Sequence, residues 1–244
     1  VDPPRHQRRG VNERADGRRA FHRVGEPDVE RELGRLAEGA DGAGMTRSIP
    51  LEKCLDDAML VYSQNGERLR PEQGYPLRLL LPGYEGNMSI KWLRRLQVAD
   101  QPVHSREETS KYTDILPNGK AREFTFVMEA KSIITSPSGG QQIEGKGFHE
   151  IRGIAWSGKG RITKVEISVD EGKTWQPARL QTPVLSKALT RFLFAWEWNG
   201  EPVVIQSRAT DETGYIQPTL ESLVEVRGVN NTYHNNAITP WRIG

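Results

Sequence analysis

The chain has 244 residues, of which 36% are hydrophobic, so it is long enough for one large domain or two modest ones, each with its own core. Its formal net charge of +2 is small, and this balance does not call for nucleic acid or a membrane surface as a partner. The single cysteine excludes an internal disulfide and any metal site built from several thiolates.

Residues 1–35 differ in composition from the rest of the chain. Nine arginines crowd a segment with few apolar residues and no regular period. Such a composition cannot bury enough apolar surface to offset the entropy lost on ordering. One interpretation is a basic arm for nucleic acid. We favour a disordered leader, or a stretch translated in the wrong reading frame.

A helix is predicted over residues 51–62, where apolar residues recur at helical spacing. Ser48 is the predicted N-cap and Gly66 the predicted stop. Cys54 lies within this segment, and we interpret it as a residue of the core rather than a nucleophile.

Two strands are predicted next, over residues 75–82 and 90–98, with a loop at 84–89 between them. The first strand carries one arginine, Arg78, and the second begins beside Lys91. A buried guanidinium next to a glycine-containing loop and an ammonium group is a suitable pocket for phosphate oxygens.

From about residue 120 the hydrophobic period becomes two, which is typical of half-buried strands. Gly, Asp and Asn turns separate these segments, and no long helical pattern interrupts them. The predicted strands are 124–130, 148–156, 163–169 with a hairpin turn at 170–173, and 192–198 joined by a second hairpin to 203–209. This pattern predicts an antiparallel β-sandwich of immunoglobulin-like type. Residues 100–119 have the composition of a linker.

Several strings, in this order, resemble the sulfite oxidase family of molybdenum-cofactor oxidoreductases. They are residues 37–41 (Ala-Glu-Gly-Ala-Asp), 48–53 (Ser-Ile-Pro-Leu-Glu-Lys), 74–79 (Gly-Tyr-Pro-Leu-Arg-Leu), 82–83 (Pro-Gly), 90–93 (Ile-Lys-Trp-Leu), 227–228 (Arg-Gly) and 241–242 (Trp-Arg). Three others resemble the sulfane dehydrogenase branch of the Sox system: 71–78 (Pro-Glu-Gln-Gly-Tyr-Pro-Leu-Arg), 106–113 (Arg-Glu-Glu-Thr-Ser-Lys-Tyr-Thr) and 207–214 (Ser-Arg-Ala-Thr-Asp-Glu-Thr-Gly).

The resemblance implies a mainly β fold. In it, the C-terminal part of an α+β molybdopterin domain is followed by an immunoglobulin-like β-sandwich dimerisation domain. The implied division is a leader at 1–35, a partial molybdopterin-binding domain at 36–108, a linker at 109–119 and the dimerisation domain at 120–244.

The resemblance also assigns cofactor contacts. Asp41 is expected to accept hydrogen bonds from the pterin, and Arg78 to bind its phosphate. Gln73 falls where animal relatives carry a cofactor-contacting histidine. The segment that gives backbone and ammonium contacts to the same cofactor contains Ser89, Ile90 and Lys91.

Two further residues match the family's active site. Tyr112 lies where the family places an active-site tyrosine, and Arg227 matches the arginine that the sandwich contributes to the oxyanion pocket. Trp92 and Trp241 are interpreted as packing residues rather than contacts to a ligand.

Simpler roles compete with these assignments. Arg78 and Lys91 would lose their cofactor role if they paired with Asp57 or Glu85. Tyr112 would lose its role if it were a linker residue facing solvent.

One departure from the family is plain. The family binds molybdenum through a cysteine well upstream of the string that ends in Asp41, and no cysteine precedes Asp41 here. Cys54 lies after that string and does not match the ligand. We therefore expect the chain to represent the C-terminal part of such an enzyme, without the metal ligand.

The implied activity is oxidation of sulfane sulfur on a sulfur-carrier protein, with a molybdenum-molybdopterin cofactor and electrons passing to a c-type cytochrome subunit. A homodimer in the periplasm is implied as well, with no nucleic acid or membrane partner. The alternatives are a sulfite dehydrogenase and a non-catalytic dimerisation or interaction module.

Overall fold

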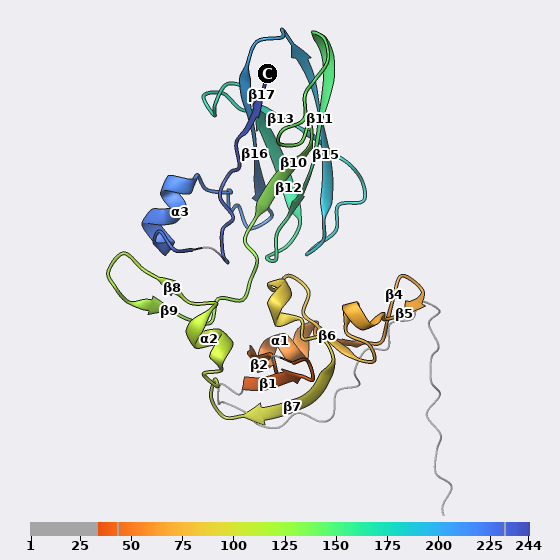
Figure 1. Ribbon diagram of the computed structural model, residues 1–244, viewed down its shortest axis with the longest axis vertical. Coiled ribbons are helices and arrows are strands. Elements are labelled where there is room, and N and C mark those ends of the chain that lie inside the picture. The colour runs from red at the N-terminus through yellow and green to blue at the C-terminus, as the bar shows by residue number, and fades with distance from the viewer. Residues whose placement is uncertain (1–33, 43, 232) are drawn as a thin grey trace, which may run out of the picture.

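The structure is a computed structural model that describes residues 34–42, 44–231 and 233–244. These residues form a smaller N-terminal part and a β-sandwich, joined by a connecting segment (Figure 1). The leader predicted at 1–35 lies almost wholly outside the described residues, which begin at Gly34. No helix in the described part of the chain is long and apolar enough to cross a membrane.

The N-terminal part contains a three-stranded antiparallel sheet in the order β2-β1-β7. Its strands are β1 (Gly34–Gly39), β2 (Thr46–Pro50) and β7 (Leu93–Ala99). The strand predicted at 90–98 is therefore present, shifted by three residues at its start. A small core supports the sheet: Ala37, Ile49, Leu79, Leu81, Met88 and Ile90.

The predicted helix at 51–62 is wrong in its second half. The helix α1 (Leu51–Asp56) ends early, and β3 (Met59–Val61) then pairs with β6 (Arg78–Leu80). This long-range pairing overrides the helical spacing of the apolar residues. The predicted N-cap is wrong too, because Pro50 takes that position and the Ser48 hydroxyl accepts a hydrogen bond from Val103 N at 3.1 Å.

Short elements complete this part and the connection. Gly66, predicted to stop the helix, instead sits with φ of 83° in the turn of a two-stranded hairpin. The short elements are β4 (Ser63–Gln64), β5 (Glu67–Arg68), the 3-10 helices η1 (Pro71–Gln73) and η2 (Gly86–Met88), α2 (Arg106–Ser110), β8 (Asp114–Ile115) and β9 (Ala121–Arg122). The segment predicted as a linker thus contains part of a helix and a strand that pairs with β9.

Two four-stranded sheets form the sandwich, which confirms the immunoglobulin-like prediction. The first has the order β10-β11-β15-β14 and the second β13-β12-β16-β17. Their strands are β10 (Lys131–Ser136), β11 (Gly147–Trp156), β12 (Ile162–Ser168), β13 (Gln176–Pro177), β14 (Arg179–Leu180), β15 (Thr190–Trp198), β16 (Val203–Asp211) and β17 (Trp241–Ile243). The helix α3 (Leu220–Arg227) lies beside the sandwich (Figure 1).

Two predictions in this region are wrong. Residues 124–130 alternate in hydrophobicity but form no regular strand, only an isolated bridge between Val127 and Tyr84. The strands at 192–198 and 203–209 exist, within β15 and β16, yet they do not form a hairpin. They belong to opposite sheets, because the chain crosses the sandwich between them. Alternation specifies which side chains point inward but not which strand is the partner.

The two parts meet through their backbones. Met128 N donates to Gly83 O at 3.0 Å, and Gly158 N donates to Met128 O at 2.7 Å. A Cβ on Gly158 would stand 1.9 Å from Gly83 O, so only glycine permits this approach. An ion pair reinforces the contact, with Lys187 Nζ 2.6 Å from Asp57 Oδ2.

Candidate active site

The segment 89–92 holds the predicted cofactor residues together through backbone hydrogen bonds. Leu79 N donates to Ile90 O at 2.9 Å, and Ala40 N donates to Trp92 O at 2.9 Å. Trp92 N donates to Gly74 O at 3.3 Å. Arg78, Asp41 and Gln73 are the chain neighbours of Leu79, Ala40 and Gly74, and Ser89, Ile90 and Lys91 belong to the segment itself. All six predicted cofactor contacts therefore lie in one region of the N-terminal part.

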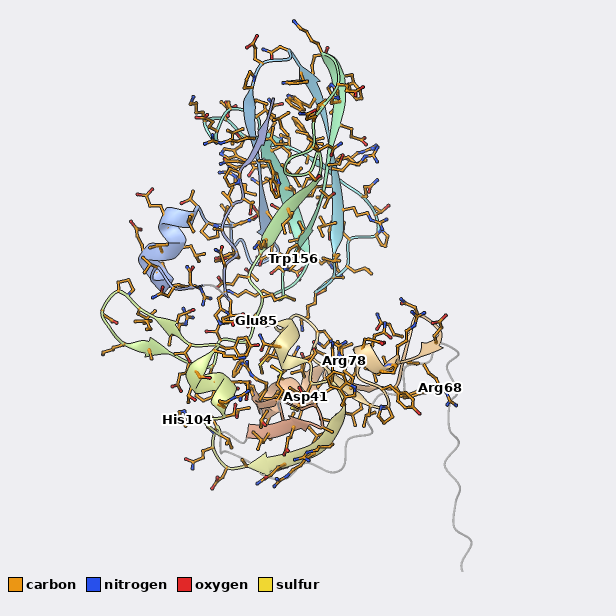
Figure 2. All side chains as sticks on the ribbon, viewed as in Figure 1. Asp41, Arg68, Arg78, Glu85, His104 and Trp156 are labelled. Atoms are coloured by element: carbon orange, nitrogen blue, oxygen red, sulfur yellow. The ribbon has the colours of Figure 1, made fainter. Side chains whose placement is uncertain are left out.

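Arg78 has the clearest sign of a ligand site. Its Nε is buried and has no hydrogen-bond partner among the described residues. Burial also lowers the pKa of its guanidinium group from the usual value. A buried donor without an acceptor is costly, and such groups commonly mark the place where an ion or a ligand binds. Figure 2 shows Arg78 and Asp41 in the same N-terminal part of the molecule.

Asp41 and Ser89 also have local structural roles. Asp41 Oδ1 accepts from Met45 N at 3.0 Å, which closes the turn between β1 and β2. Ser89 Oγ accepts from Leu81 N at 3.2 Å, and its hydroxyl proton is still available to an acceptor. These hydrogen bonds fix both side chains without using all of their capacity.

Lys91 and Gln73 meet at a glycine. Gly74 has φ of 103°, and a Cβ there would stand 2.8 Å from Lys91 Cβ. Lys91 Nζ donates to Glu72 O at 2.7 Å, while Gln73 Oε1 accepts from Arg70 N at 3.1 Å. The loop is therefore built around the stem of Lys91.

The competing ion pairs considered for Arg78 and Lys91 do not form. Asp57 contacts Lys53 and Lys187 instead. Glu85 contacts His234 instead, across the junction with the sandwich. The alternative in which these carboxylates neutralise the cofactor residues is therefore wrong.

A second group of side chains lies at the junction. The Tyr112 ring is half-buried, and it packs edge-on against the Tyr233 ring with centroids 4.8 Å apart. The Arg47 guanidinium lies 4.5 Å from the centroid of the same ring. Burial raises the pKa of the Tyr112 hydroxyl, although the nearby Arg47 charge opposes this. Tyr112 is therefore not a solvent-facing linker residue.

Arg47 was missed in the sequence. It is 0% exposed, and its Nε lies 3.0 Å from Glu108 Oε1. Neither Nη has a hydrogen-bond partner among the described residues. A signal was available in the sequence, because Arg47 is the one charged residue of the segment 46–50. That segment forms β2, whose middle residues are buried. Its position beneath Tyr112 makes it part of the candidate site.

Arg227 ends α3 and is buried. Its Nη1 lies 2.8 Å from Asp114 Oδ2, and its Nη2 lies 3.6 Å from Glu129 Oε2. Arg227 and Tyr233 both line a cavity of about 220 Å³ at the junction. Tyr233 contacts the Tyr112 ring and lines the same cavity as Arg227, so the two predicted residues lie in the same region of the structure.

The residues present fit the phosphate end of a pterin cofactor better than its metal end. Arg78 offers an unpartnered buried donor, and the hydrogen bond from Leu79 N to Ile90 O brings the segment that contains Ser89 and Lys91 beside it. Among the described residues, no group of His, Cys, Asp or Glu side chains has a geometry that would hold a metal ion. Cys54 packs against the core of the N-terminal part.

Family models match both parts of the chain. The oxidoreductase molybdopterin binding domain matches residues 27–107, and the Mo-co oxidoreductase dimerisation domain matches residues 122–240. The chain therefore has the two-domain organisation of molybdopterin oxidoreductases, which implies a molybdenum-molybdopterin cofactor. The first match begins within the 1–35 segment that was predicted as a leader.

Individual relatives define the family. Mitochondrial sulfite oxidase of Mus musculus is 30% identical over 88% of this chain, and that of Homo sapiens is 31% identical over 81%. The crystal structure of the sulfane dehydrogenase SoxCD from Paracoccus pantotrophus is 55% identical over 87% of this chain, with a TM-score of 0.84. The chain belongs to the sulfite oxidase family of molybdenum-cofactor oxidoreductases. It spans 43% and 40% of the two sulfite oxidases and 55% of the SoxCD chain.

Proposed function

We propose that this chain forms part of a molybdenum-cofactor-dependent oxidoreductase that oxidises sulfur by two electrons at a time. In our proposal the substrate is sulfane sulfur on a carrier protein, electrons leave to a c-type cytochrome subunit, and the enzyme is a periplasmic homodimer assembled through the sandwich. The 55% identity to a sulfane dehydrogenase supports this choice over a free-sulfite enzyme. The observation that carries the cofactor assignment is the unpartnered buried Nε of Arg78.

Each residue has a role in this proposal. Arg78 and Lys91 hold the pterin phosphate, since a guanidinium fork and an ammonium group both bind phosphate oxygens. Asp41 accepts from the N–H donors of the pterin. When bound, the cofactor supplies an acceptor for the electron pair of sulfur. Tyr112 and Arg227 orient the sulfur group at the junction.

A dimerisation module without catalysis is a second candidate. It is favoured by one observation: both four-stranded sheets of the sandwich are present, and the dimerisation-domain model matches residues 122–240. A module of this kind needs no cofactor, so bound pterin separates the two functions.

The test is the pterin and molybdenum content of the purified chain, produced in a host that makes molybdopterin. We expect pterin near one per chain, and at least an order of magnitude less in Arg78→Met. Arg68→Met is the matched control, because Arg68 is an exposed arginine in the same part of the molecule. Wild-type protein without pterin would refute the cofactor proposal and support the module. Full pterin content in Arg78→Met would refute the role of Arg78.

A further inference from the structure

Arg47 carries a buried charge that the proposed function does not use. Its side chain is 0% exposed, and neither Nη nitrogen has a hydrogen-bond partner among the described residues. The guanidinium instead lies over the ring of Tyr112, 4.5 Å from the centroid of that ring. A buried donor without an acceptor is costly, so this arrangement calls for a role that offsets the cost.

A carboxylate on α2 fixes Arg47 in this position. Glu108 Oε1 lies 3.0 Å from Arg47 Nε, and it also accepts from Ser48 N at 3.0 Å. Glu108 therefore contacts both the side chain of Arg47 and the backbone of the next residue in β2. These two contacts tie α2 to β2 and hold the guanidinium against the Tyr112 ring.

Several influences on the Tyr112 hydroxyl disfavour negative charge on its oxygen. Burial is the largest of them and raises the pKa of this hydroxyl, and the neighbouring Tyr233, Glu107 and Glu85 raise it as well. Arg47 lowers the same pKa, and it acts more strongly than the other three neighbours. A cation at the face of an aromatic ring is attracted to the ring, and its charge favours electron density on the hydroxyl oxygen. A phenol polarised in this way donates a stronger hydrogen bond.

We propose that Arg47 is a positioning residue for the proposed reaction. It holds the Tyr112 ring in place and makes the hydroxyl of that ring a stronger hydrogen-bond donor toward the sulfur group. This inference rests on the proposed function and adds a residue to it. Arg47 acts through Tyr112, and it neither forms nor breaks a covalent bond.

The test is the acid dissociation constant of a fluorotyrosine that replaces Tyr112 in the full chain, followed by fluorine NMR as the pH is raised. Fluorine lowers the pKa of a phenol, so the titration needs only mildly alkaline pH, and Arg47 keeps its charge throughout. We expect the dissociation constant to be about tenfold lower in the double variant Arg47→Met, Glu108→Gln. This variant removes the cation without leaving a buried carboxylate unpaired.

Arg208 and Glu166 provide a matched control in the sandwich. Arg208 Nε lies 2.9 Å from Glu166 Oε2, and the Arg208 guanidinium lies 4.3 Å from the centroid of the Trp175 ring. The double variant Arg208→Met, Glu166→Gln therefore removes the same kind of stacked ion pair at another place. It should leave the dissociation constant at position 112 unchanged.

A wild-type dissociation constant in the folded Arg47→Met, Glu108→Gln variant would overturn the inference, because Arg47 would then only pack against the ring. Arg47→Lys keeps the charge and provides a second test if the double variant does not fold. Its dissociation constant should stay within about threefold of wild type. A tenfold fall in Arg47→Lys would also overturn the inference, because the effect would then depend on the shape of the guanidinium and not on its charge. The titration requires no cofactor, so these outcomes are separable from pterin binding, which tests the proposed function.

Discussion

Glu108→Gln should destabilise the chain strongly, because it removes the partner of a buried arginine. Arg47 and Glu108 are both 0% exposed, with Arg47 Nε 3.0 Å from Glu108 Oε1. At an effective dielectric constant of about 20, two unit charges at this separation attract by about 5 kcal/mol. The amide oxygen of Gln still accepts from Ser48 N, as Glu108 Oε1 does at 3.0 Å, whereas its NH2 group cannot accept from the Ser105 hydroxyl as Glu108 Oε2 does.

The expected loss in the free energy of unfolding is about 3 kcal/mol, since breaking a buried pair leaves one charge without compensation. Urea denaturation of Arg47→Met, Glu108→Gln and the double variant measures the coupling. The double variant should recover most of the loss. Glu67→Gln removes an exposed pair with Arg70 and should cost at most about 0.5 kcal/mol. Additive losses in the double variant would refute the reasoning.

Two further predictions concern the sandwich. Phe192→Ala should cost about 4 kcal/mol in the free energy of unfolding, because Phe192 is 0% exposed in the core, while Leu220→Ala at an exposed position should cost less than about 0.5 kcal/mol. Chemical denaturation compares them, and equal losses would contradict this account of the core. Hydrogen bonds from Thr174 and then Ser168 lower the pKa of Asp170 to about 2, below the ordinary value of 3.8. The stabilisation is therefore present above pH 3.8 and is lost as the pH falls toward 2, so Asp170→Asn and wild type should converge in melting temperature at pH 2. A constant difference across this pH range would show that the carboxylate charge is not involved.

The sandwich could be predicted from the sequence alone, because alternation with a period of two indicates which side chains of a strand are buried. Val165 and Ile167 point into the core as their spacing predicted. Which strands pair with each other could not be predicted. The sequence of β15 and β16 is typical of a hairpin, but the two strands lie in different sheets. Strand pairing depends on contacts across the fold, which alternation does not encode.

The candidate site was partly predictable for a related reason. Arg78 and Tyr112 stood out through motifs, and the structure gives each of them a buried or half-buried environment. Arg47 was missed because its meaning depends on Tyr112 and Glu108, which follow about 60 residues later. The carboxylates beside Arg227 were missed for the same reason, since Asp114 precedes it by 113 positions.

The contact between Gly83 and Gly158 has a consequence for protein engineering. Each glycine comes from a different part of the chain, and neither tolerates a side chain. A Cβ on Gly158 would stand 1.9 Å from Gly83 O, and a Cβ on Gly83 would stand 2.5 Å from Gly158 O. A chimera that grafts the sandwich of one relative onto the N-terminal part of another must therefore keep glycine at both of these positions. A graft that carries alanine at either position would have to tilt one part away from the other, which would move Arg227 relative to Arg78.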